Sequence, residues 1–242
     1  MLLGPEDNHA LPRLPSAFVD TKGGVRQETA VRPGEPRWPA LLALLAIGGL
    51  YYALPCSLTV GPNWLVLILV AVLATPAVMF NGVGSRRTRL IFGYAASAVV
   101  TVSTIASLLL LISRLPKHKE SPPELLISAG ALWICNILVF ACWYWMLDAG
   151  GPHRRDLQNS HTDGAFLFPQ MVLDPQLRRE MGEEQWRPGF VDYLFLAYNT
   201  STAFSPTDVP VLSRWAKVLM MVQATISLAT VALLAARAVN IL

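Results

Sequence analysis

The chain has 242 residues, 53% of them hydrophobic and only 14% charged, with a formal net charge of +3. Soluble domains carry about 25% charged residues. Here the only charged residues within 38–112 are three arginines, and 125–147 has none. A core of this size cannot bury such long apolar runs, so the composition excludes a soluble enzyme. Basic residues beside apolar spans orient a protein in a bilayer, so no nucleic-acid partner is expected.

Residues 1–37 form a polar N-terminal segment that contains five acidic residues and five prolines. A cleavable signal peptide begins with basic residues and continues into an apolar core, and this segment lacks that pattern. It also has too little apolar surface to offset the entropy that ordering costs. The sequence therefore predicts a disordered tail over 1–37 and no signal peptide.

Five apolar stretches are long enough to cross a hydrocarbon core of about 30 Å, which takes about 20 helical residues. The first four lie within 38–148 and form a predicted domain of four transmembrane helices. The fourth ends before Gly150-Gly151-Pro152, which is typical of a helix stop. The predicted spans are 38–54, 64–80, 90–113, 125–147 and 215–242.

Residues 149–189, between the fourth and fifth spans, are polar and contain several prolines. Asp174 followed by Pro175 is typical of an N-cap residue with proline at the first helical position. Leu177 and Met181 then share one helix face, which favours a short amphipathic helix on the membrane surface. A solvated loop is the alternative interpretation of this segment.

Residues 190–204 begin apolar and become polar from Asn199 onward. A helix over this range is about 22 Å long, which is too short to span the membrane. The chain then turns and enters the last apolar stretch, a pattern that indicates a re-entrant loop within 190–242. A helix lying flat in the interface is the alternative. The predicted fold is thus all-α, with five transmembrane helices and a re-entrant half-helix before the last one.

Residues 190–242 resemble the pore helix, filter loop and inner helix of two-helix pore-loop cation channels. Potassium channels carry a threonine-rich tip, then Gly-Tyr-Gly-Asp, then a nearby proline. The hydroxyls, the aromatic residue, the Asp and the Pro match in order, whereas no Gly follows Gly189. Filter carbonyls take backbone conformations that Gly permits, so a carbonyl-lined potassium filter is not expected. The corresponding residues here are Thr200-Ser201-Thr202-Ala203-Phe204-Ser205-Pro206-Thr207-Asp208-Val209-Pro210.

A second resemblance extends from about residue 38 to the Arg237-Ala238-Val239-Asn240 end. In its five-span layout the chain is similar to uncharacterised bacterial integral membrane proteins, which have no established activity. The resemblance implies this architecture and a location in the bacterial inner membrane. The residues that carry it are Asp148, Phe166-Leu167-Phe168-Pro169, Asp192-Tyr193 and the stretch 203–208.

The hydroxyl-rich tip after the half-helix is the main candidate site. If several subunits surround one axis, a ring of hydroxyl oxygens and carboxylates can bind and pass monovalent cations. Alternatively, the same side chains cap the half-helix and fold the turn that follows. The candidate residues for an ion pathway are Thr200, Ser201, Thr202, Ser205, Thr207 and Asp208.

Asn136 and Gln223 are polar residues inside the fourth and fifth spans. Such residues usually hydrogen-bond across helices, and lining a pore is the alternative role. The four histidines have no metal-ligand spacing, and we find no nucleophile–base pair, phosphate loop or cofactor motif. We therefore expect no metal, no cofactor and no enzymatic activity.

Two functions are consistent with these features, and in both the chain lies in a lipid bilayer. The first is a homo-oligomeric, channel-like protein for cations, which the hydroxyl-rich tip favours. The second is a non-transporting binding or assembly partner in which the re-entrant loop is only structural. The missing filter glycines and the scarcity of ionisable residues inside the spans favour the second.

The distribution of Lys and Arg predicts the orientation of the chain. With a re-entrant half-helix, the tail and the segments 81–89, 149–189 and 205–217 share one side and hold most of the 19 Lys and Arg residues. The positive-inside rule places this side, and the N-terminus, in the cytoplasm and the C-terminus outside.

Deleting residues 2–25 should leave the membrane yield nearly unchanged. The deleted part has no apolar segment, and Arg26, Arg32 and Arg37 remain to set the orientation. The amount of protein in isolated membranes measures this. A collapse in yield would show that the tail packs on the rest of the chain.

Overall fold

The computed structural model describes residues 35–79, 86–114, 122–157, 164–184, 186–202 and 209–239, all within the unit Gly34–Leu242. In these ranges the regular structure is helical, with one isolated β-bridge between Phe166 and Val211. The all-α prediction is therefore confirmed for the described residues. Most of the predicted tail, and the candidate residues Ser205, Thr207 and Asp208, lie outside these ranges.

The long helices begin and end within a few residues of the predicted spans, because uninterrupted apolar sequence favours a helix. Proline sits in the first turn of α1, where its missing N–H costs no helical hydrogen bond. In chain order the elements are α1 (Trp38–Ala53), η1 (Cys56–Leu58), α2 (Trp64–Met79), α3 (Arg86–Arg114), α4 (Pro122–Leu147), η3 (Asp148–Gly150), α5 (Pro152–Leu157), α6 (Pro169–Val172), α7 (Pro175–Glu180), α8 (Phe190–Thr202) and α9 (Arg214–Val239).

Three helical segments of the described chain are long and apolar enough to cross a membrane. They are Ile91–Ser113 in α3, Pro123–Leu157, which runs from the second residue of α4 to the end of α5, and Arg214–Ala236 in α9. The apolar helices α1 and α2 have 16 residues each. Each is about 24 Å long, somewhat shorter than a hydrocarbon core of about 30 Å. The three long helices indicate a protein of the membrane.

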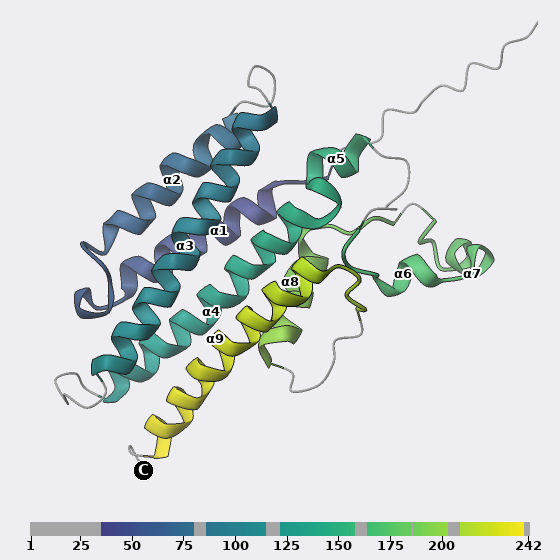
Figure 1. Cartoon of the computed structure of the whole chain (residues 1–242). Helices are drawn as coiled ribbons and strands as arrows, with labels where there is room; N and C mark the ends of the chain where they lie inside the picture. The colour runs from purple at the N-terminus through teal and green to yellow at the C-terminus, as the bar shows by residue number, and fades with distance from the viewer. Residues whose placement is uncertain are drawn as a thin grey trace, which may run out of the picture. The chain divides into compact units, whose positions relative to one another are not determined.

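Helix α4 is the centre of the bundle (Figure 1). It packs against α1, α3, α8 and α9, while α2 packs against α1 and α3. Apolar side chains cover α4 on several faces, and Leu132, Cys135, Phe140 and Ala141 are all buried. A helix that is apolar all round is stable either in a protein core or in lipid, and packing against four other helices gives α4 its central place.

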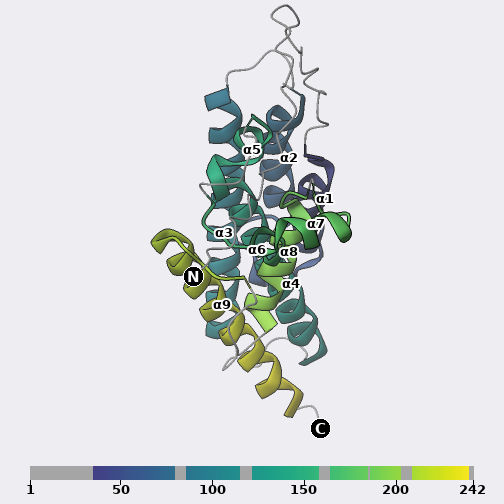
Figure 2. The ribbon, with the colours of Figure 1, turned by 90° about the vertical axis from the view of Figure 1, so that its right-hand side faces the viewer.

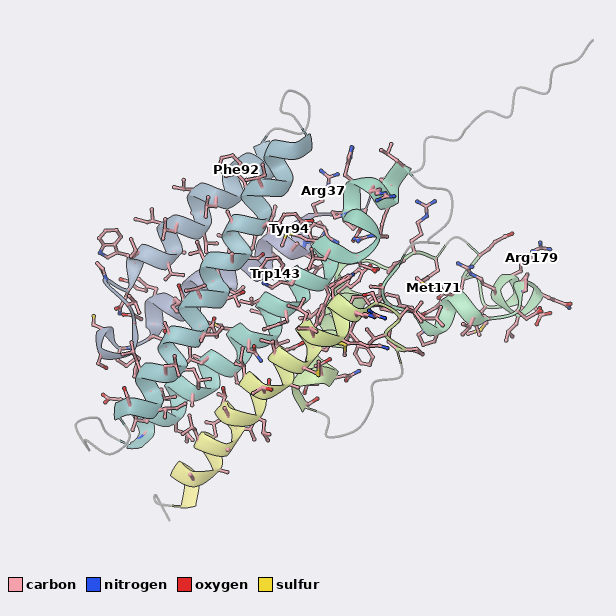
Figure 3. The ribbon with its side chains drawn as sticks, in the orientation of Figure 1. Arg37, Phe92, Tyr94, Trp143, Met171 and Arg179 are labelled. Atoms are coloured by element: carbon pink, nitrogen blue, oxygen red, sulfur yellow. The ribbon has the colours of Figure 1, made fainter. Side chains whose placement is uncertain are left out.

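Aromatic stacking and a hydrogen bond to a hydroxyl group join α3 to α4. Tyr94 and Trp143 are labelled in Figure 3, and their rings stack with centroids 6.1 Å apart. Trp143 also donates from Nε1 to Thr101 Oγ1 at 2.8 Å. Trp143 thereby partly buries its ring while its polar atom keeps a partner, which is the usual arrangement for Trp at a helix contact.

One end of the bundle, which we call the α5 end, gathers the start of α1 and the end of α4. The backbone N–H of Glu35, just before α1, donates to Asp156 Oδ1 of α5 at 2.9 Å. Arg37 forms an ion pair with the same carboxylate, with N and O atoms 3.7 Å apart. Glu35 and Arg37, which the sequence analysis assigned to the tail, therefore make contacts with the helical unit.

Helices α8 and α9 also begin at the α5 end. Phe166, which follows α5 in the chain, packs edge-on against Tyr193 in α8 and against Trp215 in α9, with ring centroids 6.2 and 6.1 Å apart. Backbone hydrogen bonds of 2.8–3.0 Å join 165–167 to 210–212, directly before α9. Helix α9 then runs to the opposite end of the bundle, away from α5 (Figure 2).

Two local signals in the sequence are confirmed. Helix α4 stops where Gly150 and Gly151 take φ values of +77° and +89°, which favour glycine. Helix α7 starts with Asp174, whose side chain accepts from Gln176 N at 2.8 Å. Leu177 on this short helix and Met181 directly after it are both exposed.

Gly48 of α1 lies where α1 crosses α2. A Cβ added at Gly48 would meet Leu67 Cδ1 at 2.5 Å and Leu67 Cα at 3.4 Å, whereas one added at Gly49 meets no described atom within 4 Å. We expect Gly48→Val to lower the free energy of unfolding by about 1–3 kcal/mol through overpacking. Melting in detergent measures this. Gly49→Val is the matched control, and an equal loss in both variants would contradict close packing of α1 on α2.

Candidate functional site

Two groups of buried or partly buried polar side chains, joined by hydrogen bonds, lie at different depths of the bundle. The first group, the mid-bundle cluster, lies among α4, α8 and α9 and consists of Asn136, Tyr144, Ser201, Gln223 and Ser227. The second group, the end cluster, lies at the α5 end and consists of Glu35, Trp145, Asp148, Arg155 and Tyr193.

Gln223 is the hub of the mid-bundle cluster and is fully buried. Its Nε2 donates to the backbone carbonyl of Ala197 at 2.7 Å and to Ser201 Oγ at 2.8 Å, both on α8. Its Oε1 accepts from the hydroxyl of Tyr144 on α4. One amide of α9 therefore ties α8 and α4 together, and a buried amide left without these partners would be costly.

Asn136 extends the cluster along α4. Its Nδ2 donates to Ser227 Oγ at 2.8 Å and to the backbone carbonyl of Gln223 at 3.2 Å. Its Oδ1 is buried and has no hydrogen-bond partner among the described residues. Asn136 and Gln223, the two intramembrane polar residues singled out in the sequence, thus hydrogen-bond across helices inside one chain.

The described hydroxyls of the predicted tip each have a partner within the chain. Thr200 Oγ1 donates to the carbonyl of Leu196 at 2.8 Å, and Thr202 Oγ1 donates to the carbonyl of Tyr198 at 2.9 Å, both along α8. Ser201 faces Gln223. The other predicted tip residues, Ser205, Thr207 and Asp208, lie outside the described residues.

Asp148 and Tyr193 form the inner part of the end cluster, and both are fully buried. The hydroxyl of Tyr193 donates to Asp148 Oδ2 at 2.6 Å. Asp148 Oδ1 accepts from the backbone N–H of Ala165. A carboxylate directly after α4 thereby holds both the chain segment before α6 and the first turn of α8.

Arg155 forms the outer part of the end cluster. Its Nη1 donates to the carbonyls of Trp145 and Asp148 at 2.8 and 2.9 Å, which satisfies two acceptors at the end of α4. Its Nη2 donates to Glu35 Oε2 at 2.8 Å. The guanidinium carbon lies 5.1 Å from the centroid of the Tyr193 ring, within the range of a cation–π contact.

Glu35 is the second charge of this outer part. Its Oε1 accepts from Trp145 Nε1, and its Oε2 pairs with Arg155. Burial raises the pKa of Glu35 above its usual value of 4.5. The charge of Arg155 and the hydrogen bonds from Trp145 and Arg155 lower this pKa, but burial outweighs them. The negative charge of nearby Asp156 raises the pKa further.

The sequence analysis did not identify the end cluster as a site. Its hydrogen bonds join Glu35 to Arg155 over 120 positions and Asp148 to Tyr193 over 45. The available signal was the second resemblance, which rested in part on Asp148, Phe166-Leu167-Phe168-Pro169 and Tyr193. These residues meet around Tyr193, whose ring centroid lies 5.4 Å from that of Phe168 and 6.2 Å from that of Phe166.

Comparison with protein-family models, curated proteins and solved structures found no match to this chain. Among the described residues, no three His, Cys, Asp or Glu side chains are grouped so that they can hold a metal ion. The polar groups of both clusters instead bind one another, so what they do most directly is fix the position of α8.

Gln223→Leu should lower the free energy of unfolding by about 1–3 kcal/mol, because the partners of the amide on α8 and α4 stay buried without it. Thr225→Val is the matched control, because Thr225 is exposed on the same helix and bonds only to its own helix at Met221. Thermal unfolding in detergent measures both variants. Equal melting temperatures for the two would contradict the role given to Gln223.

The raised pKa of Glu35 predicts a pH dependence of stability. The folded chain holds this proton to a higher pH than the unfolded chain does. The contribution of Glu35 to the free energy of unfolding is therefore fully present below pH 4.5. It is lost as the pH rises through the pKa of Glu35 in the folded chain. The melting temperature of the parent relative to Glu35→Gln should fall over that range. Glu184→Gln, which removes an exposed carboxylate, controls for net charge, and parallel profiles of parent and Glu35→Gln would contradict the assignment.

Proposed function

We propose that this chain is a five-span membrane protein in which α8 is a re-entrant half-helix that brings a hydroxyl-rich tip to a cation path in a homo-oligomer. The observation that carries the proposal is the direction of α8. It begins beside α9 at the α5 end, and its next-to-last residue, Ser201, contacts Gln223. The chain is back beside 165–167 at residues 210–212.

The lengths of these helices support a half-helix. Helix α8 has 13 residues, which is about 20 Å. Gln223 is nine residues beyond Arg214, at about 14 Å along α9. A helix that stops at this depth does not cross a core of about 30 Å. The shorter helices α1 and α2 fit as spans if the bilayer thins or flanking residues reach the interface.

The chemistry of the tip supports cations as the permeant class. The C-terminal end of a helix carries partial negative charge on its last carbonyls, and α8 presents this end at membrane depth. The sequence places further negatively polarised oxygens at or after this end of the helix. They are the hydroxyl oxygens of Thr200 and Thr202 and the carboxylate of Asp208. Without glycines, selectivity would come from side-chain oxygens instead of from a carbonyl filter.

A second candidate, a non-transporting assembly protein, is favoured by one specific observation. The hydroxyls of Thr200, Ser201 and Thr202 all hydrogen-bond within the chain. In this case α8 completes the packing of α4 and α9, and the tip faces no water.

Charge supports the orientation that we propose, with the α5 end in the cytoplasm of a bacterial cell. Arg37, Arg154, Arg155, Arg214 and Lys217 lie at or beside this end, which the positive-inside rule assigns to the cytoplasm. The short helix α7 would then lie near the cytoplasmic headgroups with Leu177 and Met181 toward the lipid.

Flux through proteoliposomes tests the function. Asp208→Asn keeps the shape and a hydrogen-bonding oxygen but removes the charge, so it should lower monovalent cation flux at unchanged oligomeric state. Asn caps a turn about as well as Asp. If Asp208 only folds the turn, Asp208→Asn therefore equals the parent. Equal flux in both, no flux in either, or a monomer in detergent would reject the cation path.

Cysteine labelling in intact cells tests the orientation, and the chain supplies its own control. Cys56 is exposed beyond α1, on the side proposed to face outward. An impermeant maleimide should label Cys56 in the parent. It should not label Ser160→Cys in a Cys56→Ala background until the membrane is permeabilised. Labelling of Ser160→Cys in intact cells would reverse the orientation.

A further inference from the structure

The end cluster connects two parts of the chain that have no sequence relation: the residues before α1 and the first turn of the half-helix α8. Arg155 touches both. Its guanidinium bonds to Glu35 on one side and faces the ring of Tyr193 on the other. The side chain of Arg155 is 4% exposed and that of Glu35 is 11% exposed, so the contact is largely shielded from water.

Arg155 depends on Glu35 for its place in the cluster. Its Nη1 donates to two backbone carbonyls, whereas its Nη2 donates to the side chain of Glu35. Its Nε is buried and has no partner among the described residues. If Glu35 moves away, Nη2 also loses its carboxylate, and a buried guanidinium in which both Nε and Nη2 lack an acceptor is more stable in water.

Tyr193 depends in turn on Arg155. The ring is fully buried with Phe166 and Phe168 packed edge-on against it, and the guanidinium lies over it. Departure of Arg155 would open this side of the ring to water. Tyr193 is in the first turn of α8, and Ala197 and Ser201 follow it at intervals of four on the same helix face, where both contact Gln223. Movement at Tyr193 is therefore transmitted along the face that holds α8 to α9.

We infer that Arg155 is a positioning residue that couples the segment 35–37 to α8, so that displacement of Glu35 loosens the half-helix from α9. If α8 carries a cation path, this coupling regulates it, and to that extent the inference rests on the proposed function. The coupling itself is a property of the fold and can be measured without flux.

A cysteine at Ser201 reports on the contact between α8 and α9. Ser201 is buried, and its Oγ accepts from Gln223, a role that a thiol can take. Its reaction with N-ethylmaleimide, in a Cys56→Ala background, therefore requires α8 to move from α9. Ser97→Cys is the matched control, because Ser97 is also buried, lies on α3, and like Ser201 is 11 residues after the first residue of its helix.

Two variants break the coupling and two preserve it. Glu35→Lys puts a second positive charge against Arg155, and Arg155→Met keeps the length but removes the guanidinium. Each should speed labelling of Ser201→Cys about tenfold, the population change given by 1.4 kcal/mol. Glu35→Gln keeps an acceptor oxygen without like charge and should label as the parent does. So should Glu184→Lys, which reverses an exposed charge on the projecting segment that carries Arg179 (Figure 3).

The outcomes separate the inference from the proposed function. Faster labelling at Ser201→Cys with an unchanged Ser97→Cys rate supports the coupling, even if the parent passes no cations. Equal rates in parent, Glu35→Lys and Arg155→Met overturn it, even if the parent conducts. Acceleration at both probes also overturns it, because the variants then loosen the whole bundle instead of α8.

Discussion

The packing of α4, α8 and α9 depends on one buried amide. Gln223 lies on a helix that is long and apolar enough to cross a membrane, and in a bilayer core no water is present to satisfy its side chain. Its donors can be satisfied only by acceptors from a neighbouring helix, and Ala197 and Ser201 of α8 supply them. Tyr144 of α4 supplies the donor for its carbonyl. The position of α8 follows from this requirement.

A second polar group fixes the other end of α8. A helix of 13 residues is marginal by itself, because most of its stability comes from packing against neighbours. Near its end, α8 is held through Ser201. At its base it is held through Tyr193, which bonds to Asp148 and stacks under Arg155. Polar contacts at two depths, with apolar packing between them, give a short helix one defined place.

This arrangement is useful for either of the functions considered. A tip that binds cations has to be held in position, because side-chain oxygens select ions only when their spacing is maintained. An assembly protein needs the same rigidity to present a constant surface. The two functions therefore share the same scaffold and differ in whether water reaches the end of α8. If a cation path is present, the missing glycines determine the kind of filter and leave the scaffold unchanged.

The sequence by itself determined the helical class, the approximate bounds of the long helices and the signals that start or stop them. These features are local: apolar length, glycines after α4 at positive φ, and Asp174 before Pro175 each act within a few residues. It also indicated that Asn136 and Gln223 need partners inside the spans. Composition and spacing are enough for such conclusions because they depend on the backbone and the solvent.

Only the tertiary structure decided which partners these groups take. Gln223 meets Tyr144 across 79 positions, and Glu35 meets Arg155 across 120, distances over which a single sequence carries no pairing information. The tail was expected to end at Arg37, yet Glu35 bonds to Arg155, because a guanidinium buried at the end of α4 needs a hydrogen-bond acceptor. Long-range pairs of this kind arise when buried polar groups must be satisfied in three dimensions, and that condition exists only once the helices have packed.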